Sequence, residues 1–255
     1  MSRSFFEWVA VILERFGPLF LSGTANTVLI AVSGTVLGFG LGLLVAVARG
    51  IKPAPRARFL SRALLAVLKG VLNVYIEVFR GTPMMVQAAV IFYGVQMYYG
   101  IRLDALVAGV FVVSINTGAY MAEIVRGGIQ SVDVGQTEAA HSIGMTHWQT
   151  MTSVVLPQAI RNIMPAIGNE FIVNIKDSCV LNVISVTELF FQARAAAGAT
   201  YRFFEVYFII GLIYLALTFT VSRLLRLLER RMDGPASYAI HGSQSPAAPV
   251  QKEGG

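Results

Sequence analysis

The sequence has little charge, one cysteine and three histidines. Only 13% of its 255 residues are charged, whereas 55% are hydrophobic. Soluble domains carry about 25% charged residues, so the composition indicates an integral membrane protein. The single cysteine, Cys179, excludes an internal disulfide and a metal site made of cysteines. His141 and His147 are six residues apart, which does not match the i, i+4 spacing of a helical zinc pair.

A nucleotide-binding loop of the form G-x-x-x-x-G-K-[ST] is also absent from the sequence. If ATP drives this protein, the nucleotide must therefore bind on another chain. The 20 Lys and Arg residues outnumber the 14 Asp and Glu residues, but they gather at the ends of apolar segments. That pattern is typical of cytoplasmic anchoring in a membrane. We therefore expect no nucleic-acid partner, and no metal or other cofactor bound by this chain.

Long apolar stretches predict an all-α integral membrane protein with about five spans. A span needs about 20 mostly apolar residues, and long uncharged runs separate the charged positions. The second span is expected to be long and kinked at 81–83, where glycine and proline interrupt it. A separate, sixth span over 59–79 is the alternative. The five spans are placed at about 19–48, 60–100, 103–125, 161–183 and 204–228.

The two ends of the chain differ from the predicted membrane domain, 17–232. Apolar residues fall on one helical face within 1–16, which predicts a short helix lying in the membrane interface. Small, polar and proline-rich sequence over 233–255 predicts a disordered tail. In the first span Gly34, Gly38 and Gly42 recur at intervals of four. That spacing lets another helix approach closely, either within the chain or in a dimer.

Basic residues set the expected orientation in the membrane. The segments that follow the first and the last span are both rich in Lys and Arg, which predicts that both are cytoplasmic. With five spans the N-terminus is then outside and the C-terminus inside, and the loop 126–157 is cytoplasmic. The basic ends are also expected to hold anionic membrane lipid.

The cytoplasmic loop has the signals of two short helices. Asp133 can cap the first helix, and Gly144 is its natural end. Thr146 can cap the second helix, with Gln149 in the capping-box position. No acid, base and nucleophile are grouped there, so catalysis is not expected. A compact polar platform attached to two spans is suited to transmitting a push from another protein.

Five segments of the sequence resemble known transporter motifs. "EAAHSIGMTHWQTMTSVVLP" (138–157) resembles the EAA loop of importer-type ABC transporter permeases. "VFRGTP" (78–83), "AYMAEIVRGGIQSVDVGQTEAA" (119–140), "NIKDS" (174–178) and "VTEL" (186–189) are similar to the branch that takes up polar amino acids such as histidine, glutamine, glutamate and arginine. The resemblance covers about residues 20–232. It departs at Cys179, where the family pattern has serine.

This resemblance implies the partners and the coupling residues. The loop would fit a groove on a separate ATP-binding subunit, present in two copies, which would bind the ATP and magnesium. A second permease chain, either another copy or a related sister, and an extracytoplasmic amino-acid-binding protein would complete the importer in the bacterial inner membrane. The residues expected to contact the ATPase are Glu138, Ala139, Ala140, Gly144, Met145 and His147.

Polar residues inside the spans are candidates for the substrate path, because charge in a membrane usually faces a cavity or a partner. In the fourth span Glu170, Asn174 and Asp177 share one helical face, with Lys176 on a neighbouring stripe. Glu170 could meet the ammonium of an amino acid, and Lys176 or a backbone N–H its carboxylate. The full set of candidates is Arg80, Asn116, Tyr120, Glu170, Asn174, Lys176 and Asp177.

Several alternatives to this interpretation stay open. In one alternative, Glu123–Arg126, Glu77–Arg80 and Lys176–Asp177 are structural ion pairs near the interfaces. The whole chain could be a passive channel, or an ABC permease for another small solute. A membrane-embedded enzyme is disfavoured, because the histidines and the cysteine do not form a catalytic group.

Overall fold

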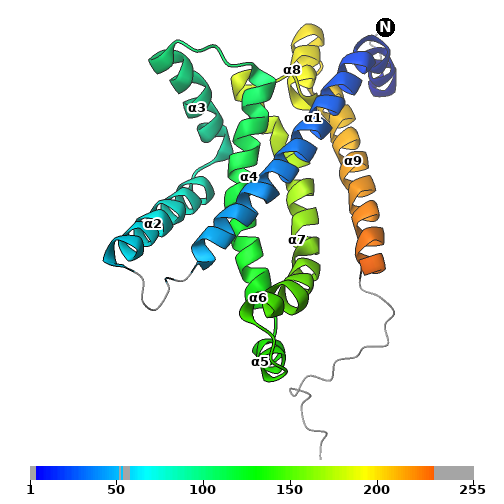
Figure 1. Ribbon diagram of the computed structural model, residues 1–255. Helices are drawn as coiled ribbons and strands as arrows, with labels where there is room; N and C mark the ends of the chain where they lie inside the picture. Colours follow the sequence, from blue (N-terminus) through cyan, green and yellow to red (C-terminus); the bar gives the residue numbers. More distant parts are fainter. Residues whose placement is uncertain (1–3, 52, 54–57, 233–255) are drawn as a thin grey trace, which may run out of the picture.

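The computed structural model describes residues 4–51, 53 and 58–232, and every regular element in them is helical (Figure 1). The predicted tail, 233–255, lies outside the described residues. A π-helical turn, η1 (Met151–Val155), precedes α7, and a 3₁₀ turn, η2 (Ser178–Ile184), follows it. The helices are α1 (Phe5–Gly50), α2 (Phe59–Gly81), α3 (Met84–Tyr99), α4 (Ala105–Gln130), α5 (Val134–Ser142), α6 (His147–Thr150), α7 (Leu156–Asp177), α8 (Leu189–Thr200) and α9 (Phe203–Met232).

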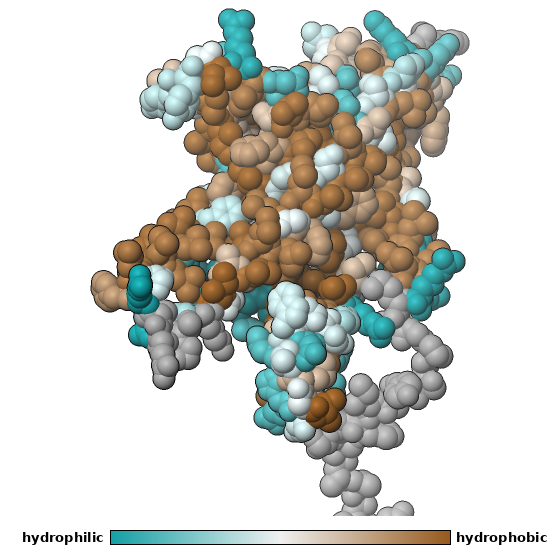
Figure 2. Space-filling model, viewed as in Figure 1, coloured by the Kyte–Doolittle hydropathy of each residue, from teal (hydrophilic) through white to brown (hydrophobic). Residues whose placement is uncertain are grey.

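Four of the described helices, α1, α2, α4 and α9, are long and apolar enough to cross a membrane. A fifth candidate span is the pair formed by 147–184 and α8, which is bent by 57°. An apolar belt crosses the face of the molecule shown in Figure 2, and polar side chains gather above and below it. The all-helical fold class, with four to five candidate spans, is thereby confirmed.

Helix α1 continues through both the predicted interfacial segment and the first span. It begins at a capping box in which Ser4 and Glu7 bond each other's backbone N–H groups. Ile12, Phe16 and Phe20 are buried in one cluster with residues of α8 and α9. The helix therefore does not end at the predicted boundary near residue 16, because the same apolar face continues to pack across it.

The centre of the fold is a close crossing of α1 and α4. A Cβ atom added to Gly38 would lie 2.7 Å from Cβ of Thr117, and one added to Gly42 would lie 2.5 Å from Cβ of Met121. One added to Gly34 would overlap Val113. Only glycine allows backbones this close. The glycine spacing predicted a close helix contact either within the chain or in a dimer. The contact within the chain is present.

The predicted second span is two helices in the structure. Helix α2 ends at Gly81, Thr82 is extended, and α3 begins after Pro83. Proline has no backbone N–H, so a continuous helix could not form its hydrogen bond at this position. Helix α2 by itself has the length and hydropathy of a span, whereas α3 has 16 residues and is shorter than one.

Helix α8 was not predicted from the sequence. Its first turn is capped by Glu188, whose carboxylate accepts hydrogen bonds from the backbone N–H groups of Phe190 (2.9 Å) and Phe191 (2.7 Å). The hydroxyl of Tyr214 on α9 donates a third, of 3.1 Å. Glu188 is completely buried. Its three donors satisfy the polar atoms that burial removes from water, and they attach α8 to α9.

Candidate functional site

A polar projection formed by α5 and α6 extends from one end of the helical bundle (Figures 1 and 2). The carboxylate of Asp133 accepts a 2.7 Å hydrogen bond from the N–H of Gly135. Thr146 and Gln149 form a capping box at the start of α6. The two caps predicted from the sequence are therefore confirmed.

A left-handed turn at Gly144 joins the two short helices. Gly144 has φ of +82°, a region that costs other residues about 1–2 kcal/mol. Its N–H donates to the carbonyl of His141 at 3.0 Å, and the N–H of Met145 donates to the carbonyl of Ala140 at 3.1 Å. These bonds satisfy carbonyl groups that the end of α5 leaves free. The turn therefore fixes the direction of α6 relative to α5.

The projection is attached firmly to two long helices. Val132, Val155 and Ala159 are buried in one cluster between the end of α4 and the start of α7. The side-chain amide of Asn162 donates a 2.9 Å hydrogen bond to the hydroxyl of Ser131. Packed helices move as rigid bodies, so a displacement of the projection would be transmitted to α4 and α7.

The predicted coupling residues differ in exposure. Glu138, Ala139, Gly144 and His147 are exposed, and Met145 is half-buried. Ala140, by contrast, is only 4% exposed and packs inside the projection.

Three exposed apolar side chains on the projection were not predicted from the sequence. Val134, Ile143 and Trp148 are 68%, 79% and 75% exposed, respectively. The sequence signal for these side chains was the presence of large apolar residues in an otherwise polar loop. Exposed apolar groups on a polar rim are typical of a protein-binding surface.

Asn174 lies in the packed interior of the membrane domain. It is 3% exposed and donates a 2.9 Å hydrogen bond to the hydroxyl of Thr35, while it accepts one of 3.1 Å from Thr117. These bonds join α7 to α1 and α4. The contacts of Asn174 are those of a bridge between helices, whereas Glu170 is half-buried and Asp177 is exposed.

Asn116, another predicted path residue, contacts the break between α2 and α3. Its side-chain N–H group donates to the carbonyl of Phe79 at 3.2 Å and to the side-chain oxygen of Gln87 at 2.9 Å. Gln87 was not singled out from the sequence. The signal for Gln87 in the sequence was an amide side chain close to Pro83. A helix break at proline leaves carbonyl groups without backbone donors, and an amide can donate to them.

Two of the predicted path residues, Arg80 and Tyr120, are in contact. The guanidinium carbon of Arg80 is 5.4 Å from the centre of the Tyr120 ring, within the range of a cation–π contact. The structure therefore brings together residues of α2 and α4 that are far apart in the sequence. Glu170, on α7, is half-buried.

Glu123 belongs to an ion-pair network at the end of α4. It pairs with Arg49 of α1 and with Arg126, whose nitrogens lie 2.6 and 3.0 Å from its carboxylate. The structural interpretation of Glu123–Arg126 is thereby confirmed. Within the described part of the chain, neither of the other two suggested pairs, Glu77–Arg80 and Lys176–Asp177, forms such a bridge.

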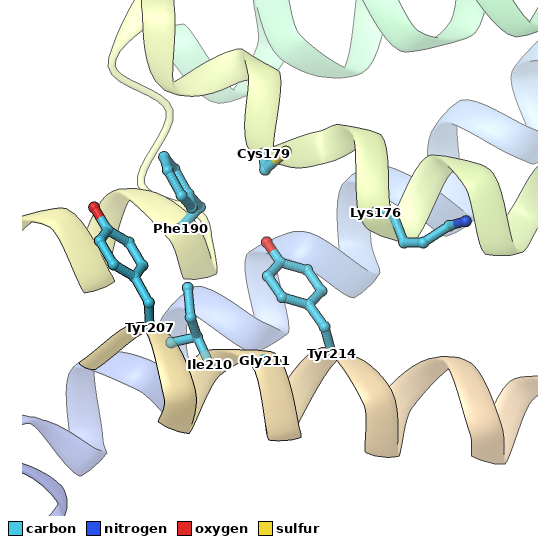
Figure 3. A pocket seen from close by; sticks show the side chains of 7 residues that line it. All are labelled: Lys176, Cys179, Phe190, Tyr207, Ile210, Gly211 and Tyr214. Carbon is cyan, nitrogen blue, oxygen red and sulfur yellow. The ribbon is translucent and has the colours of Figure 1, made fainter. Parts of the chain in front are cut away.

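A cavity of about 340 Å³ lies between the end of α7, α8 and α9 (Figure 3). The rings of Phe190 and Tyr207 stack in its wall with centres 5.8 Å apart. Cys179 and Tyr214 line it as well, and the ammonium group of Lys176 points away from the aromatic side chains in Figure 3. Cys179, where the sequence departs from the family pattern, thus lies in the wall of a mostly apolar space.

Comparison with known proteins assigns the family. Residues 38–234 match the model of the family described as "Binding-protein-dependent transport system inner membrane component". The glutamine transport system permease protein GlnP of Escherichia coli K12 is 36% identical over 89% of this chain and 98% of its own. The arginine transport system permease protein ArtQ of Bacillus subtilis is 34% identical over 84% and 93%, respectively.

Solved structures agree with this assignment. The structure titled "Crystal structure of an amino acid ABC transporter with histidines" is 42% identical, with a TM-score of 0.79 over 91% of this chain and all of that one. An inward-facing structure of the MetNI methionine ABC transporter, at 17% identity and a TM-score of 0.68, shares the fold. The chain belongs to the inner-membrane components of binding-protein-dependent transport systems and is the multi-pass, non-catalytic permease component of an amino-acid ABC transporter.

Proposed function

We propose that this permease moves a polar amino acid across the membrane while a separate ATPase pushes on the projection formed by α5 and α6. The observation that carries this proposal is the construction of the projection. It turns at Gly144, presents Glu138 and His147 to solvent, and packs directly onto α4 and α7. Closure of the ATPase on ATP and magnesium would then tilt these helices as levers.

The proposed orientation puts the projection in the cytoplasm, the N-terminus outside and the C-terminus inside. The end of the bundle that carries α5 and α6 also carries the end of α1 and the end of α9 (Figure 1). Both of those helices end in basic residues, which favour the cytoplasmic side. They are Arg49 in α1 and Arg230 and Arg231 in α9.

The proposed contact surface on the projection extends the residues expected from the sequence. Glu138, Ala139, Gly144, Met145 and His147 would contact the ATPase, together with the exposed side chains of Ile143 and Trp148. Ala140 would act indirectly, because its methyl group packs within the projection.

A second permease chain, either a copy or a sister, is proposed to face the open side of α7. Asn162, Asn169 and Lys176 are exposed there at intervals of seven residues, which places them on one face of the helix. Polar and charged groups are costly in contact with lipid. A second chain would close a water-filled path over this face. Two ATP-binding subunits and an extracytoplasmic binding protein complete the proposed importer.

The proposed substrate path runs past Arg80, Tyr120 and Glu170, with Lys176 and Asp177 nearby. Glu170 would bind the ammonium group of the amino acid, and a basic side chain would bind its carboxylate. Asn116 and Asn174 would support the path through their helix contacts. Relatives named for glutamine and for arginine transport agree with a polar substrate.

Co-purification tests the coupling. A tagged copy is solubilised gently from its native host, beside Gly144→Asp and the matched control Gly127→Asp, a helical glycine with open space around it. We expect the ATPase to accompany the unsubstituted chain and the control, and to be lost from Gly144→Asp. Absence of an ATPase from all three, or uptake into vesicles without ATP, would instead favour a passive channel.

A further inference from the structure

The break between α2 and α3 leaves a carbonyl group without its helical partner. In a continuous helix the N–H of residue 83 would bond the carbonyl of Phe79, but Pro83 has no N–H. Two side-chain amides donate to this carbonyl instead of the missing N–H group. Gln87 donates to the carbonyl of Phe79 at 2.9 Å, and Asn116 donates to it at 3.2 Å.

Gln87 has further partners at the same break. Its side-chain nitrogen also lies 2.9 Å from both the carbonyl and the hydroxyl oxygen of Thr82, and its side-chain oxygen accepts a 2.9 Å bond from Asn116. The residue is 7% exposed. One buried amide of α3 thus joins the end of α2, the extended residue between the helices, and α4. Inside a membrane no solvent can replace these bonds.

Arg80 follows directly after the carbonyl that Gln87 holds. Its guanidinium group lies over Tyr120, which is one helical turn from Asn116 along α4. The end of α2 is therefore fixed to α4 at two successive turns, through its backbone at Asn116 and through the Arg80 side chain at Tyr120. A change in the angle between α2 and α3 would move Arg80 away from Tyr120.

We propose that Gln87 is a positioning residue, which sets the angle between α2 and α3 and so holds Arg80 beside Tyr120 in the substrate path. This inference rests on the proposed function, because it takes Arg80 to be part of the substrate path. Gln87 itself does not contact the transported molecule. It acts through the backbone of α2.

Distances between spin labels measure the angle directly. Cys179→Ala removes the native cysteine, and labels are placed at Leu64→Cys on α2 and Val90→Cys on α3, which are 70% and 66% exposed. The measurement uses the complete transporter in lipid vesicles. Gln87→Leu is expected to broaden and shift the distance distribution. Gln96→Leu, an exposed glutamine on the same helix, is the matched control and should leave it narrow. An unchanged distribution in Gln87→Leu overturns the proposal.

Uptake by the same complexes distinguishes two roles of Gln87. One is to position Arg80, and the other is only to hydrogen-bond the carbonyl of Phe79. Gln87→Leu should lower the ATP-driven uptake rate by roughly tenfold to a hundredfold, because a displacement of about 1 Å can cost about a hundredfold. In the double variant Pro83→Ala, Gln87→Leu, a helical residue 83 again bonds Phe79, so the melting temperature should recover while uptake stays low. Recovery of uptake together with the melting temperature would overturn the positioning role.

Arg80→Gln distinguishes this inference from the proposed path. Reduced uptake by Arg80→Gln with an unaltered label distance in Gln87→Leu overturns only the role of Gln87. Normal uptake by Arg80→Gln overturns the use of Arg80 in the path and the positioning proposal with it.

Discussion

Asn174 on α7 is hydrogen-bonded at 2.9 Å to the hydroxyl of Thr35 on α1, a residue 139 positions earlier in the chain. The same side chain accepts a bond from Thr117 on α4. Three long helices therefore meet at one buried amide. Asn174 was expected to line the substrate path. In the structure it lies in the packed interior instead.

Replacing this amide should destabilise the permease. Asn174→Leu leaves the hydroxyls of Thr35 and Thr117 without a partner, which costs about 1–3 kcal/mol. We expect a lower melting temperature of the purified permease. Gln96→Leu, at an exposed position on α3, is the control and should melt normally. If Asn174→Leu were to melt normally and fail only in transport, a substrate contact would be indicated.

A methyl group at the crossing of α1 and α4 should also be destabilising. Gly42→Ala would place a Cβ atom 2.5 Å from Cβ of Met121, and relieving such a clash costs about 1–3 kcal/mol. Gly40→Ala meets open space and removes a helical glycine at no steric cost, so it should be neutral or slightly stabilising. Thermal unfolding of the two variants in detergent makes the comparison. Equal melting temperatures would contradict the packing described for this crossing.

The exposed apolar residues on the projection should contribute to binding of the ATPase. We expect Ile143→Ala, Trp148→Ala to weaken that affinity by about 2 kcal/mol, or roughly thirtyfold, because apolar anchors dominate protein interfaces. Titration of the solubilised permease with the ATPase measures it. Ser153→Ala, an exposed residue of η1, is the control. An affinity equal to that of the control would exclude these side chains from the contact.

Glu170→Gln should abolish uptake and leave assembly intact. The substitution removes the negative charge proposed to hold the substrate ammonium, while it keeps the size of the side chain. Uptake of labelled amino acid into vesicles is measured beside co-purification of the ATPase. Glu14→Gln, exposed near the N-terminus, serves as the control. Unchanged uptake by Glu170→Gln would remove Glu170 from the path.

The sequence by itself determined the membrane class, the order of the apolar segments and the caps of α5 and α6. These features are local. Hydropathy over about 20 residues specifies a span, and Asp133, Gly144 and Thr146 act on backbone groups within a few positions of themselves. The motif at 138–157 likewise indicated the family, which the comparisons confirmed.

Tertiary structure alone decided which polar residues support the fold and which are grouped near a possible path. Spacing placed Glu170, Asn174 and Asp177 on one side of α7, but it could not say that Thr35 and Thr117 would take Asn174 into the interior. The partners of Gln87 at the break were likewise unpredictable. A helical period fixes the direction of a side chain from its own axis, whereas its partner depends on where other helices cross that axis.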